Sequence, residues 1–172
     1  MFRNATMADL DQVAAIYDRI HTEEEAGRST VGWIRGSTPP AKPPWRPSRQ
    51  GICSWPRRTG RLWPPPRSTR SRSPSMPAPP GAGEAKPQEV MVLHTLVVDP
   101  QVKGKGWGSR FVAFYEDYAK DHGCRDLRMD TNERNAAARR LYHNLGYQEV
   151  SILPCEFNGI PGVNLVCLEK LL

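Results

Sequence analysis

Residues 37–83 constrain the fold of this 172-residue chain more than any other stretch, because they contain 13 of its 17 prolines. Proline lacks a backbone N–H and is excluded from helix interiors and central strands. The stretch also has nine lysines and arginines but no aspartate or glutamate, so its charges repel one another. Proline runs such as residues 64–66 favour polyproline II structure or disorder. We therefore expect residues 37–83 to form neither helix nor strand.

Composition excludes several classes of protein. The formal net charge of +6 arises in residues 37–83, because the rest of the chain is acidic on balance. The chain is therefore not a basic nucleic-acid-binding domain as a whole. It contains no run of about 18 apolar residues, which argues against a membrane span. The length predicts a single domain.

The cysteines favour a reducing compartment. Cys53, Cys124, Cys155 and Cys167 lack the spacing of zinc sites and of disulfide frameworks. We expect no metal, and we interpret the last three as small apolar residues. Because the N-terminus also lacks an apolar signal-peptide core, we expect a cytoplasmic protein.

The N-terminal part, residues 1–36, has an ordinary globular pattern. Residues 2–6 are typical of a short strand. Thr6 or Asp9 is placed to cap a helix whose apolar residues recur at helical spacing. Residues 29–34 suggest a further short helical turn. The three consecutive glutamates at 23–25 are most simply a solvated run of charge, with an acceptor-binding edge as the alternative.

Residues 87–172 show a regular succession of strand and helix patterns. The order is strand, helix, strand, helix, strand, strand, which indicates an α/β or α+β sheet domain. We expect strands at residues 90–98, near 127–129, at 147–153 and at 164–168, and helices from 107 up to Gly123 and at 135–145, with turn signals at 158–159 and 161–162. The chain thus divides into residues 1–36, a Pro/Arg-rich segment at 37–86 and a core at 87–172.

A glycine-rich loop, Lys103-Gly104-Lys105-Gly106-Trp107-Gly108, joins the first strand and first helix of this core. Free amides and the helix dipole make such a junction an anion site, and glycine lets the backbone approach a diphosphate closely. A Walker A loop is excluded because Gly108 is followed by Ser109 rather than by lysine. The glycine spacing also departs from the dinucleotide-binding pattern.

Two motifs carry a resemblance to a known family. Residues 98–108 resemble motif A of the GNAT (GCN5-related) N-acetyltransferases, Arg/Gln-x-x-Gly-x-Gly/Ala, with Lys103 in the first position as a departure from the pattern. Residues 135–147 are similar to the family's motif B, Asn-x-x-Ala-x-x-Leu-Tyr-x-x-x-Gly-Phe/Tyr. The matching residues are Gly106 and Gly108 in motif A, and Asn135, Ala138, Leu141, Tyr142, Gly146 and Tyr147 in motif B.

The resemblance implies a GNAT-like acyl-CoA N-acyltransferase fold with a central mixed sheet flanked by helices. It implies transfer of an acetyl group from acetyl-CoA to a primary amine, by direct attack in a ternary complex. The acceptor would be a small-molecule or peptide amine. The sequence leaves the oligomeric state open, although many members of the family pair as homodimers.

The resemblance also assigns site residues. The pantetheine arm of acetyl-CoA would pair with backbone groups of Leu96, Val97 and Val98, and an amide near Val97 would polarise the thioester carbonyl. Tyr142 matches the tyrosine that faces the sulfur, so it is the candidate general acid, and Asn135 would bind the cofactor or orient nearby backbone. The diphosphate would contact the loop residues Lys103, Gly104, Lys105, Gly106, Trp107, Gly108 and Ser109.

The general base is left open. Glu89 and His94 lie on or beside the central strand, and His94 has a suitable intrinsic pKa, although a packed core histidine is the simpler interpretation. Glu156, in the turn-rich stretch before the last strand, is a candidate for lining the acceptor pocket.

The family would place two further strands between residues 36 and 87. We hypothesise that residues 37–83 result from a reading-frame error. When segments of this stretch are back-translated and read one base earlier, they give sequence that is typical of strands. Two functional alternatives remain: a coenzyme A-binding domain without turnover, and a protein that binds nucleic acid or peptide through the Pro/Arg-rich segment.

Overall fold

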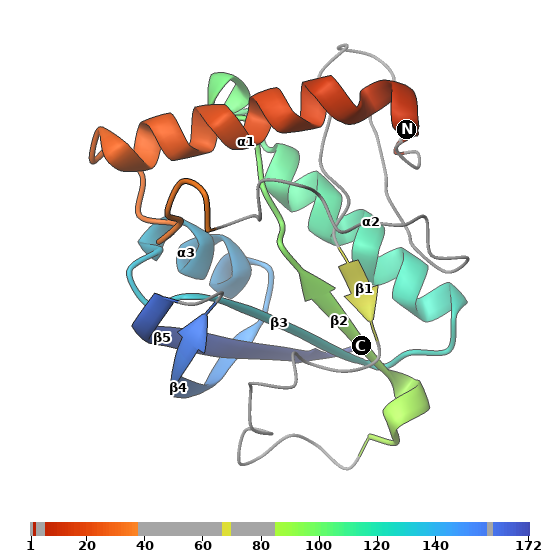
Figure 1. Ribbon diagram of the computed structural model, residues 1–172. Coiled ribbons are helices and arrows are strands. Elements are labelled where there is room, and N and C mark those ends of the chain that lie inside the picture. Colours follow the sequence, from red (N-terminus) through yellow and green to blue (C-terminus); the bar gives the residue numbers. More distant parts are fainter. Residues whose placement is uncertain (1, 3–5, 38–66, 70–84, 158–159) are drawn as a thin grey trace.

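The computed structural model describes residues 2, 6–37, 67–69, 85–157 and 160–172 (Figure 1). Five strands form one mixed sheet in the order β1-β2-β3-β5-β4. The pair β2–β3 is parallel, and the other three pairs are antiparallel. The elements are α1 (Leu10–Glu25), β1 (Arg67–Thr69), β2 (Val90–His94), α2 (Trp107–Asp121), β3 (Asp126–Asn132), α3 (Ala136–Asn144), β4 (Gln148–Phe157) and β5 (Ile160–Leu171), with 3₁₀ turns at Met7–Asp9, Pro87–Glu89 and Pro100–Val102.

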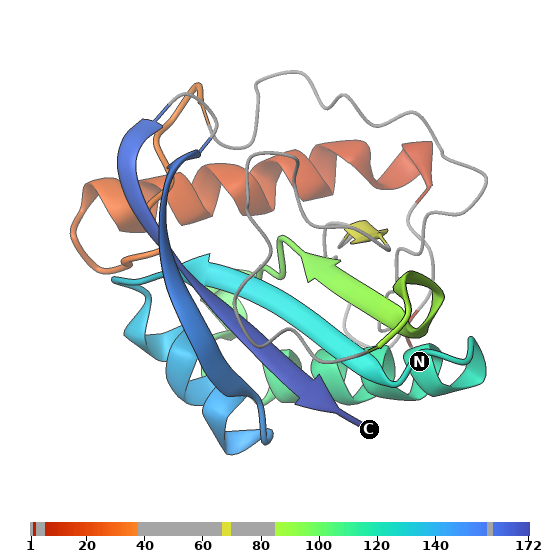
Figure 2. The same ribbon diagram turned by 90° about the horizontal axis from the view of Figure 1, so that it is seen from below.

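Helices cover both faces of the sheet. Figure 2 shows α1 on one side and α2 with α3 on the other. The α2–α3 side holds the larger core, in which Phe111 and Tyr115 of α2 pack against Leu127 and Met129 of β3. On the other side, α1 packs its apolar stripe against Val97. The mixed sheet flanked by helices is the expected fold, and the strand and helix order of residues 87–172 is confirmed.

The start of α1 follows local capping chemistry. The Thr6 backbone N–H donates to Asp9 Oδ2 at 2.7 Å, and the Thr6 hydroxyl donates to the same oxygen at 2.9 Å. Such a capping box satisfies groups that a helix start leaves unpaired. The expected strand at residues 2–6 is wrong where it is described, since Phe2 and Thr6 lie outside any strand, and residues 3–5 lie outside the described residues.

The first core strand is shorter than expected. We predicted a strand over residues 90–98, but β2 ends at His94. Its pairing with β3 ends at Leu93 and Met129, whereas β3 continues along β5 as far as Asn132. Thr95 has a φ of 60°, which is rare for a residue other than glycine and turns the chain out of the ladder. The two parallel strands therefore separate at their carboxyl ends.

The Pro/Arg-rich segment contributes a strand, which corrects our expectation. Residues 67–69 form β1 and pair antiparallel with residues 92–94 of β2. These three residues follow the proline run at 64–66 and contain no proline, so all their N–H groups are available to a ladder. The rest of residues 38–84 lies outside the described residues, as does Cys53.

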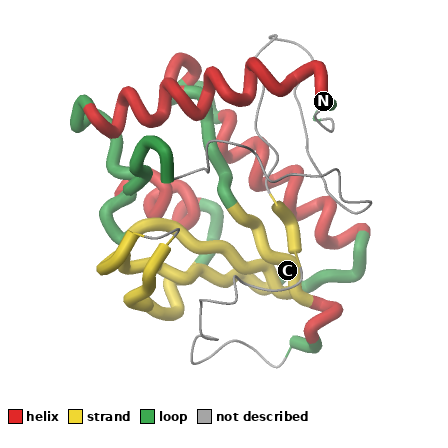
Figure 3. Tube along the Cα trace, in the orientation of Figure 1, coloured by secondary structure: helices red, strands yellow, loops and turns green. Residues whose placement is uncertain are grey.

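The C-terminal hairpin is longer than expected. We placed strands at 147–153 and 164–168, but β4 and β5 reach residues 157 and 160. The turn signal at residues 161–162 therefore lies inside β5, and residues 158–159 are outside the described residues. The edge position of β4 tolerates Pro154, because an edge strand leaves N–H groups outside the ladder. Figure 3 shows the strands gathered below α1.

Two further sequence expectations concern the described residues. None of the described helices is long and apolar enough to cross a membrane. Cys124, Cys155 and Cys167 are free thiols, and Cys124 and Cys167 are buried in apolar clusters.

Candidate functional site

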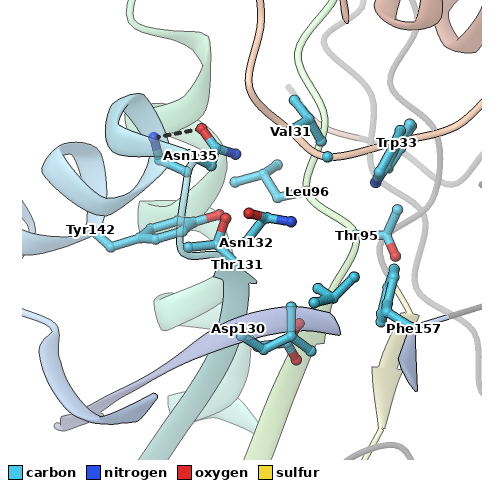
Figure 4. A pocket seen from close by; sticks show the side chains of 14 residues that line it. Val31, Trp33, Thr95, Leu96, Asp130, Thr131, Asn132, Asn135, Tyr142 and Phe157 are labelled. Atoms are coloured by element: carbon cyan, nitrogen blue, oxygen red, sulfur yellow. Dashed lines mark hydrogen bonds between the residues drawn. The ribbon is translucent and has the colours of Figure 1, made fainter. Parts of the chain in front are cut away.

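A pocket opens where β2 and β3 separate (Figure 4). The pocket is open to solvent. One wall comes from Thr95 and Leu96, which follow β2, and another from the end of β3 and the adjoining α3. The described residues that line it are Val31, Gly32, Trp33, Thr95, Leu96, Asp130, Thr131, Asn132, Asn135, Ala138, Tyr142, Phe157, Val163 and Leu165.

The roof of the pocket is a loop held by α1. The Glu24 carboxylate accepts the backbone N–H groups of Val31 and Gly32, each at 2.8 Å. Gly32 has a φ of 81°, and a Cβ there would lie 2.3 Å from Asn132 Nδ2. Only glycine therefore lets the loop approach the end of β3 this closely. The helical turn expected at residues 29–34 is wrong, because the Glu24 carboxylate holds this segment as an irregular loop.

The other two glutamates of this run are also paired. Arg28 donates to Glu23 and Arg35 donates to Glu25, and each side-chain hydrogen bond lowers the pKa of its carboxyl. Glu23 and Glu25 keep solvent-accessible side chains and pair with arginines at the surface, as expected of a solvated run of charge. Glu24 differs from them, because its carboxylate fixes the loop over the pocket.

Tyr142 lies at the inner end of the pocket. It is buried on α3, and Figure 4 shows its hydroxyl directed into the cavity. Burial, followed by the nearby Asp130 carboxylate, raises the pKa of Tyr142 well above its ordinary value of about 10. The phenol therefore stays protonated through neutral and mildly alkaline pH and acts as a hydrogen-bond donor.

Asn135 is the N-cap of α3. Its Oδ1 accepts the backbone N–H of Ala138 at 3.2 Å, which Figure 4 shows as a dashed line. This bond fixes the first turn of α3, where Ala138 faces the pocket. A capping side chain of this kind stabilises a helix by about 1 kcal/mol. The geometry thus gives Asn135 an orienting role beside the pocket.

The glycine loop presents unpaired amides. Within the described part of the chain, the N–H groups of Gly104 and of residues 106–109 donate to no backbone or side-chain acceptor. The first backbone bond of α2 runs from Arg110 to Gly106, whose φ of 74° ends the loop in a left-handed turn. Lys103 and Lys105 are exposed on either side of Gly104. The junction therefore has the free donors and the positive charge of an anion site.

An ion pair fastens this loop to α1. Arg19 donates to both oxygens of Asp99, at 3.0 and 2.8 Å, and Asp99 is only 4% exposed. The Asp99 carboxylate also accepts the Gln101 N–H at 3.0 Å and so begins the turn before the glycines. A bidentate pair fixes direction as well as distance. The loop is thus held in one orientation relative to the sheet.

Three comparisons with known proteins bear on this geometry. Residues 68–147 match the model of the acetyltransferase (GNAT) family. Over this range, which is just under half of the chain, the protein is similar to GNAT acetyltransferases. The matched range contains both motifs and the last two residues of β1, so the similarity extends into the Pro/Arg-rich segment.

Curated relatives match this chain over a limited length. YhfO of Bacillus subtilis (strain 168), described as an uncharacterized N-acetyltransferase, is 36% identical over 62 residues, which are 36% of this chain and 42% of that protein. Other curated N-acetyltransferases are matched over 29% to 41% of their lengths. The matched part of this chain therefore spans less than half of these relatives.

Solved structures share the fold over the whole chain. A GCN5-related N-acetyltransferase from Kribbella flavida superposes with a TM-score of 0.65 at 16% identity, covering 100% of this chain and 97% of that one. An aminoglycoside 6'-N-acetyltransferase complexed with coenzyme A gives a TM-score of 0.62 at 13% identity, covering 99% and 96%. The GNAT-like fold expected from the two motifs is confirmed.

The structure brings some predicted site residues together and separates others. Leu96, Asn135 and Tyr142 line the pocket, and the glycine loop adjoins it through α3, because a Cβ on Gly108 would lie 2.9 Å from Leu141. Val97 is buried against α1, so only its backbone is available to a ligand.

The two candidate bases, Glu89 and His94, do not line the pocket, and neither does Glu156, the candidate for the acceptor side. Glu89 lies at the opposite end of β2, where it accepts the Lys86 N–H at 3.0 Å and pairs with Arg125 at 3.2 Å. The Lys86 hydrogen bond is the main cause that lowers its pKa. His94 ends β2 opposite Arg67 of β1, outside the lining. Glu156 is exposed, because strand alternation turns Phe157 toward the pocket and its neighbour away.

Sequence reasoning missed the carboxylate that does line the pocket. Asp130 pairs with Cys167 in the β3–β5 ladder, and Asn132 pairs with Leu165. Both therefore face away from the side on which Met129 packs against α2 and α3. In the sequence, Leu127 and Met129 alternate with charged residues, and these polar neighbours, which face the opposite side of the sheet, were the signal to follow.

The alternative of a nucleic-acid or peptide partner rests on the Pro/Arg-rich segment. Of residues 37–86, only 37, 67–69 and 85–86 are among the described residues. That alternative therefore stays a prediction from the sequence.

Proposed function

We propose that this chain transfers an acetyl group from acetyl-CoA to a primary amine. The observation that carries the proposal is a pair of stretches with unpaired backbone groups, one beside the pocket and one in the glycine loop. Within the described residues, the N–H and C=O groups of residues 95–98 take part in no backbone hydrogen bond, and the free amides of the glycine loop follow them. Acetyl-CoA has a complementary form, with a diphosphate at one end of an amide-containing arm.

The residues present fit that substrate. The loop amides and Lys103 would hold the diphosphate, and residues 95–98 would pair with the amides of the arm as an added strand does. The bound acetyl-CoA supplies an acetyl group activated as a thioester. The backbone N–H near Val97 would donate to the carbonyl oxygen, where negative charge develops as the amine attacks.

Proton transfers would fall to two side chains. An amine attacks only after it has lost its proton, and Asp130 is the carboxylate that lines the pocket. Tyr142 would donate a hydrogen bond to the sulfur as the carbon–sulfur bond breaks. A thiol has a pKa of about 8.5, below that of the buried phenol, so Tyr142 stabilises the thiolate by hydrogen bonding rather than by giving up its proton completely.

Binding of acetyl-CoA tests the proposal directly. Calorimetry with the full chain is expected to give a Kd between about 1 µM and 1 mM, the usual range of KM values. Gly106→Val is expected to weaken that affinity at least about tenfold, because a left-handed backbone costs a branched residue roughly 1–2 kcal/mol and the new side chain enters the anion site.

Gly123→Val is the matched control for this measurement. Gly123 has a φ of 71°, its Cβ would also meet open space, and it lies just beyond the other end of α2. Its replacement should leave acetyl-CoA affinity within about twofold. Absence of binding heat in the folded parent chain, or an equal loss in both variants, would contradict the proposed diphosphate site.

Tyr142→Phe is expected to lower kcat about tenfold to a hundredfold, because the sulfur loses its hydrogen-bond donor as it becomes charged. The KM for acetyl-CoA should change less than threefold. Tyr118→Phe is the control, because Tyr118 is a partly buried residue of α2 that does not line the pocket. Release of free thiol in the presence of an amine measures the rate, and unchanged turnover in Tyr142→Phe would rule out the assigned role.

A further inference from the structure

The roof loop, residues 31–33, lies between α1 and the end of β3. Val31 and Trp33 pack on the apolar side of α1. On the other side of the loop, a Cβ on Gly32 would lie 2.3 Å from Asn132 Nδ2. All three loop residues line the pocket. The space beneath the loop therefore depends on how far from β3 the loop is held.

Glu24, on the last turn of α1, holds the loop at that distance. Its Oε2 accepts the backbone N–H of Val31 and its Oε1 accepts that of Gly32, each at 2.8 Å. Within the described residues, neither N–H donates to a backbone carbonyl, because the loop belongs to no helix or strand. Hydrogen bonds to an ionised acceptor are roughly twice as strong as those between neutral groups. Two of them on successive amides fix both the distance and the tilt of the loop.

The roof loop covers the amine side of the pocket in the proposed complex. Acetyl-CoA would bind along residues 95–98 and at the glycine loop, and the roof loop belongs to neither stretch. Figure 4 shows Trp33 on the side of the pocket away from Tyr142, the residue that would face the sulfur. The amine has to approach the thioester carbon through the space that acetyl-CoA leaves free. The loop that Glu24 holds therefore forms a wall of that space.

A second anchor on the same helix serves the other substrate. Arg19 donates to both oxygens of the buried Asp99 carboxylate and so holds the glycine loop. Helix α1 thus carries one anchor for the loop that would hold acetyl-CoA and another for the loop over the amine.

We infer that Glu24 is the positioning residue of the amine site: its carboxylate holds the roof loop at the distance from β3 that an amine acceptor needs, while Arg19 positions the acetyl-CoA loop. This inference rests on the proposed acetyl transfer and assigns control of its amine side to one side chain. Glu24 itself does not line the pocket, so its effect reaches the amine through the backbone of Val31 and Gly32. Loss of the carboxylate thus weakens amine binding and spares acetyl-CoA binding.

Steady-state kinetics of thiol release test the inference, with the two KM values measured separately. The amine probe is whichever of ethylamine, 2-phenylethylamine and spermidine the parent chain acetylates fastest. Glu24→Ala is expected to raise the KM for this amine at least about tenfold, because it removes two charge-assisted hydrogen bonds. Glu24→Gln keeps one carbonyl oxygen as an acceptor, so the rise should be about threefold. In both variants kcat and the KM for acetyl-CoA should stay within about twofold of the parent values.

Glu25→Gln is the matched control, because it removes the neighbouring carboxylate charge. Glu25 pairs with Arg35, which keeps Asp18 as a second partner. Neither Glu25 nor Arg35 lines the pocket, so both KM values should equal those of the parent chain. A rise in the amine KM as large as that in Glu24→Gln would overturn the inference, because lost charge rather than the two amide bonds would explain it.

Gly32→Ala displaces the roof loop while Glu24 stays in place. Its Cβ would lie 2.3 Å from Asn132 Nδ2 and so forces the loop and β3 apart. The amine KM should rise at least about fivefold, since such overpacking is relieved only by movement of the wall. Gly36→Ala is the control, because Gly36 has a similar φ of 85° but its Cβ would meet open space. An unchanged amine KM in both Glu24→Ala and Gly32→Ala would overturn the inference.

Arg19→Lys is expected to give the opposite pattern. Lysine keeps the charge but loses the bidentate geometry, so the KM for acetyl-CoA should rise about fivefold while the amine KM stays within about twofold. Equal changes of both KM values, in Arg19→Lys or in Glu24→Ala, would show that α1 acts on the whole site as one unit. That result would overturn the division between the two anchors.

Calorimetry with acetyl-CoA separates this inference from the function on which it rests. Absence of binding to the folded parent chain overturns the proposed function, and the inference with it. Binding without turnover of any of these amines overturns acetyl transfer and the inference but leaves the diphosphate site. Turnover with an amine KM that Glu24→Ala leaves unchanged overturns the inference alone.

Discussion

Asp130→Asn is expected to lower kcat by roughly 10²- to 10³-fold, within the usual contribution of a positioned acid–base group. Asparagine keeps the size of the side chain and its place in the β3–β5 ladder, but it cannot take a proton from the amine. The affinity for acetyl-CoA, measured by calorimetry, should change less than threefold, because the glycine loop is untouched. Stopped assays of thiol release with the same amine probe give the rate.

Asp117→Asn provides a matched control for this experiment. Asp117 is exposed on α2, and its nearest ionic partner is Lys120 at 3.9 Å. A rate for Asp130→Asn within threefold of the parent would show that proton removal belongs to another group or to solvent. A folded Asp117→Asn variant with full activity would exclude a general effect of lost negative charge.

Restoring the reading frame across residues 37–83 is expected to raise the thermal unfolding midpoint by about 10–20 °C. The sheet ends at β1, a strand of three residues beside the five of β2. A longer partner strand that buries about three more apolar side chains would add about 5 kcal/mol. For a domain of this size, each 1 kcal/mol corresponds to about 2–4 °C.

The experiment compares two chains in the same thermal scan. One is the chain as given, and the other is translated after a one-base shift between residues 37 and 83. A control chain carries a Gly/Ser linker of equal length in place of that segment. The gene sequence is a prior check. If none of the single-base shifts in this stretch yields alternating apolar residues, the hypothesis fails. An equal midpoint for the shifted chain and the linker chain would also contradict it.

The C-terminal half of the fold could be predicted from local sequence signals. Helix α3 runs from its cap at Asn135 to the turn at Gly146, as the motif indicated. Helix α2 likewise begins at the glycine loop and ends before Gly123. Each of these boundaries depends on a residue with a special backbone preference or a capping side chain, so a single sequence is sufficient to locate it.

The features that could not be predicted depend on contacts between distant residues. The early end of β2 comes from the positive φ of Thr95, and no local signal marks it. The loop at residues 29–34 is fixed by the Glu24 carboxylate rather than by its own sequence pattern. Asp130 lines the pocket and Glu89 does not, because β2 and β3 separate at their carboxyl ends. The sequence does not show at which end these strands separate.

The ion pair between Arg19 and Asp99 joins residues that are 80 positions apart and lie on opposite sides of the Pro/Arg-rich segment. The N-terminal helix is consequently a structural component of the proposed anion site. Occupancy of the loop and integrity of the first 25 residues are thermodynamically linked. A fragment that begins at the first core strand would keep both motifs and still lose the orientation on which they depend.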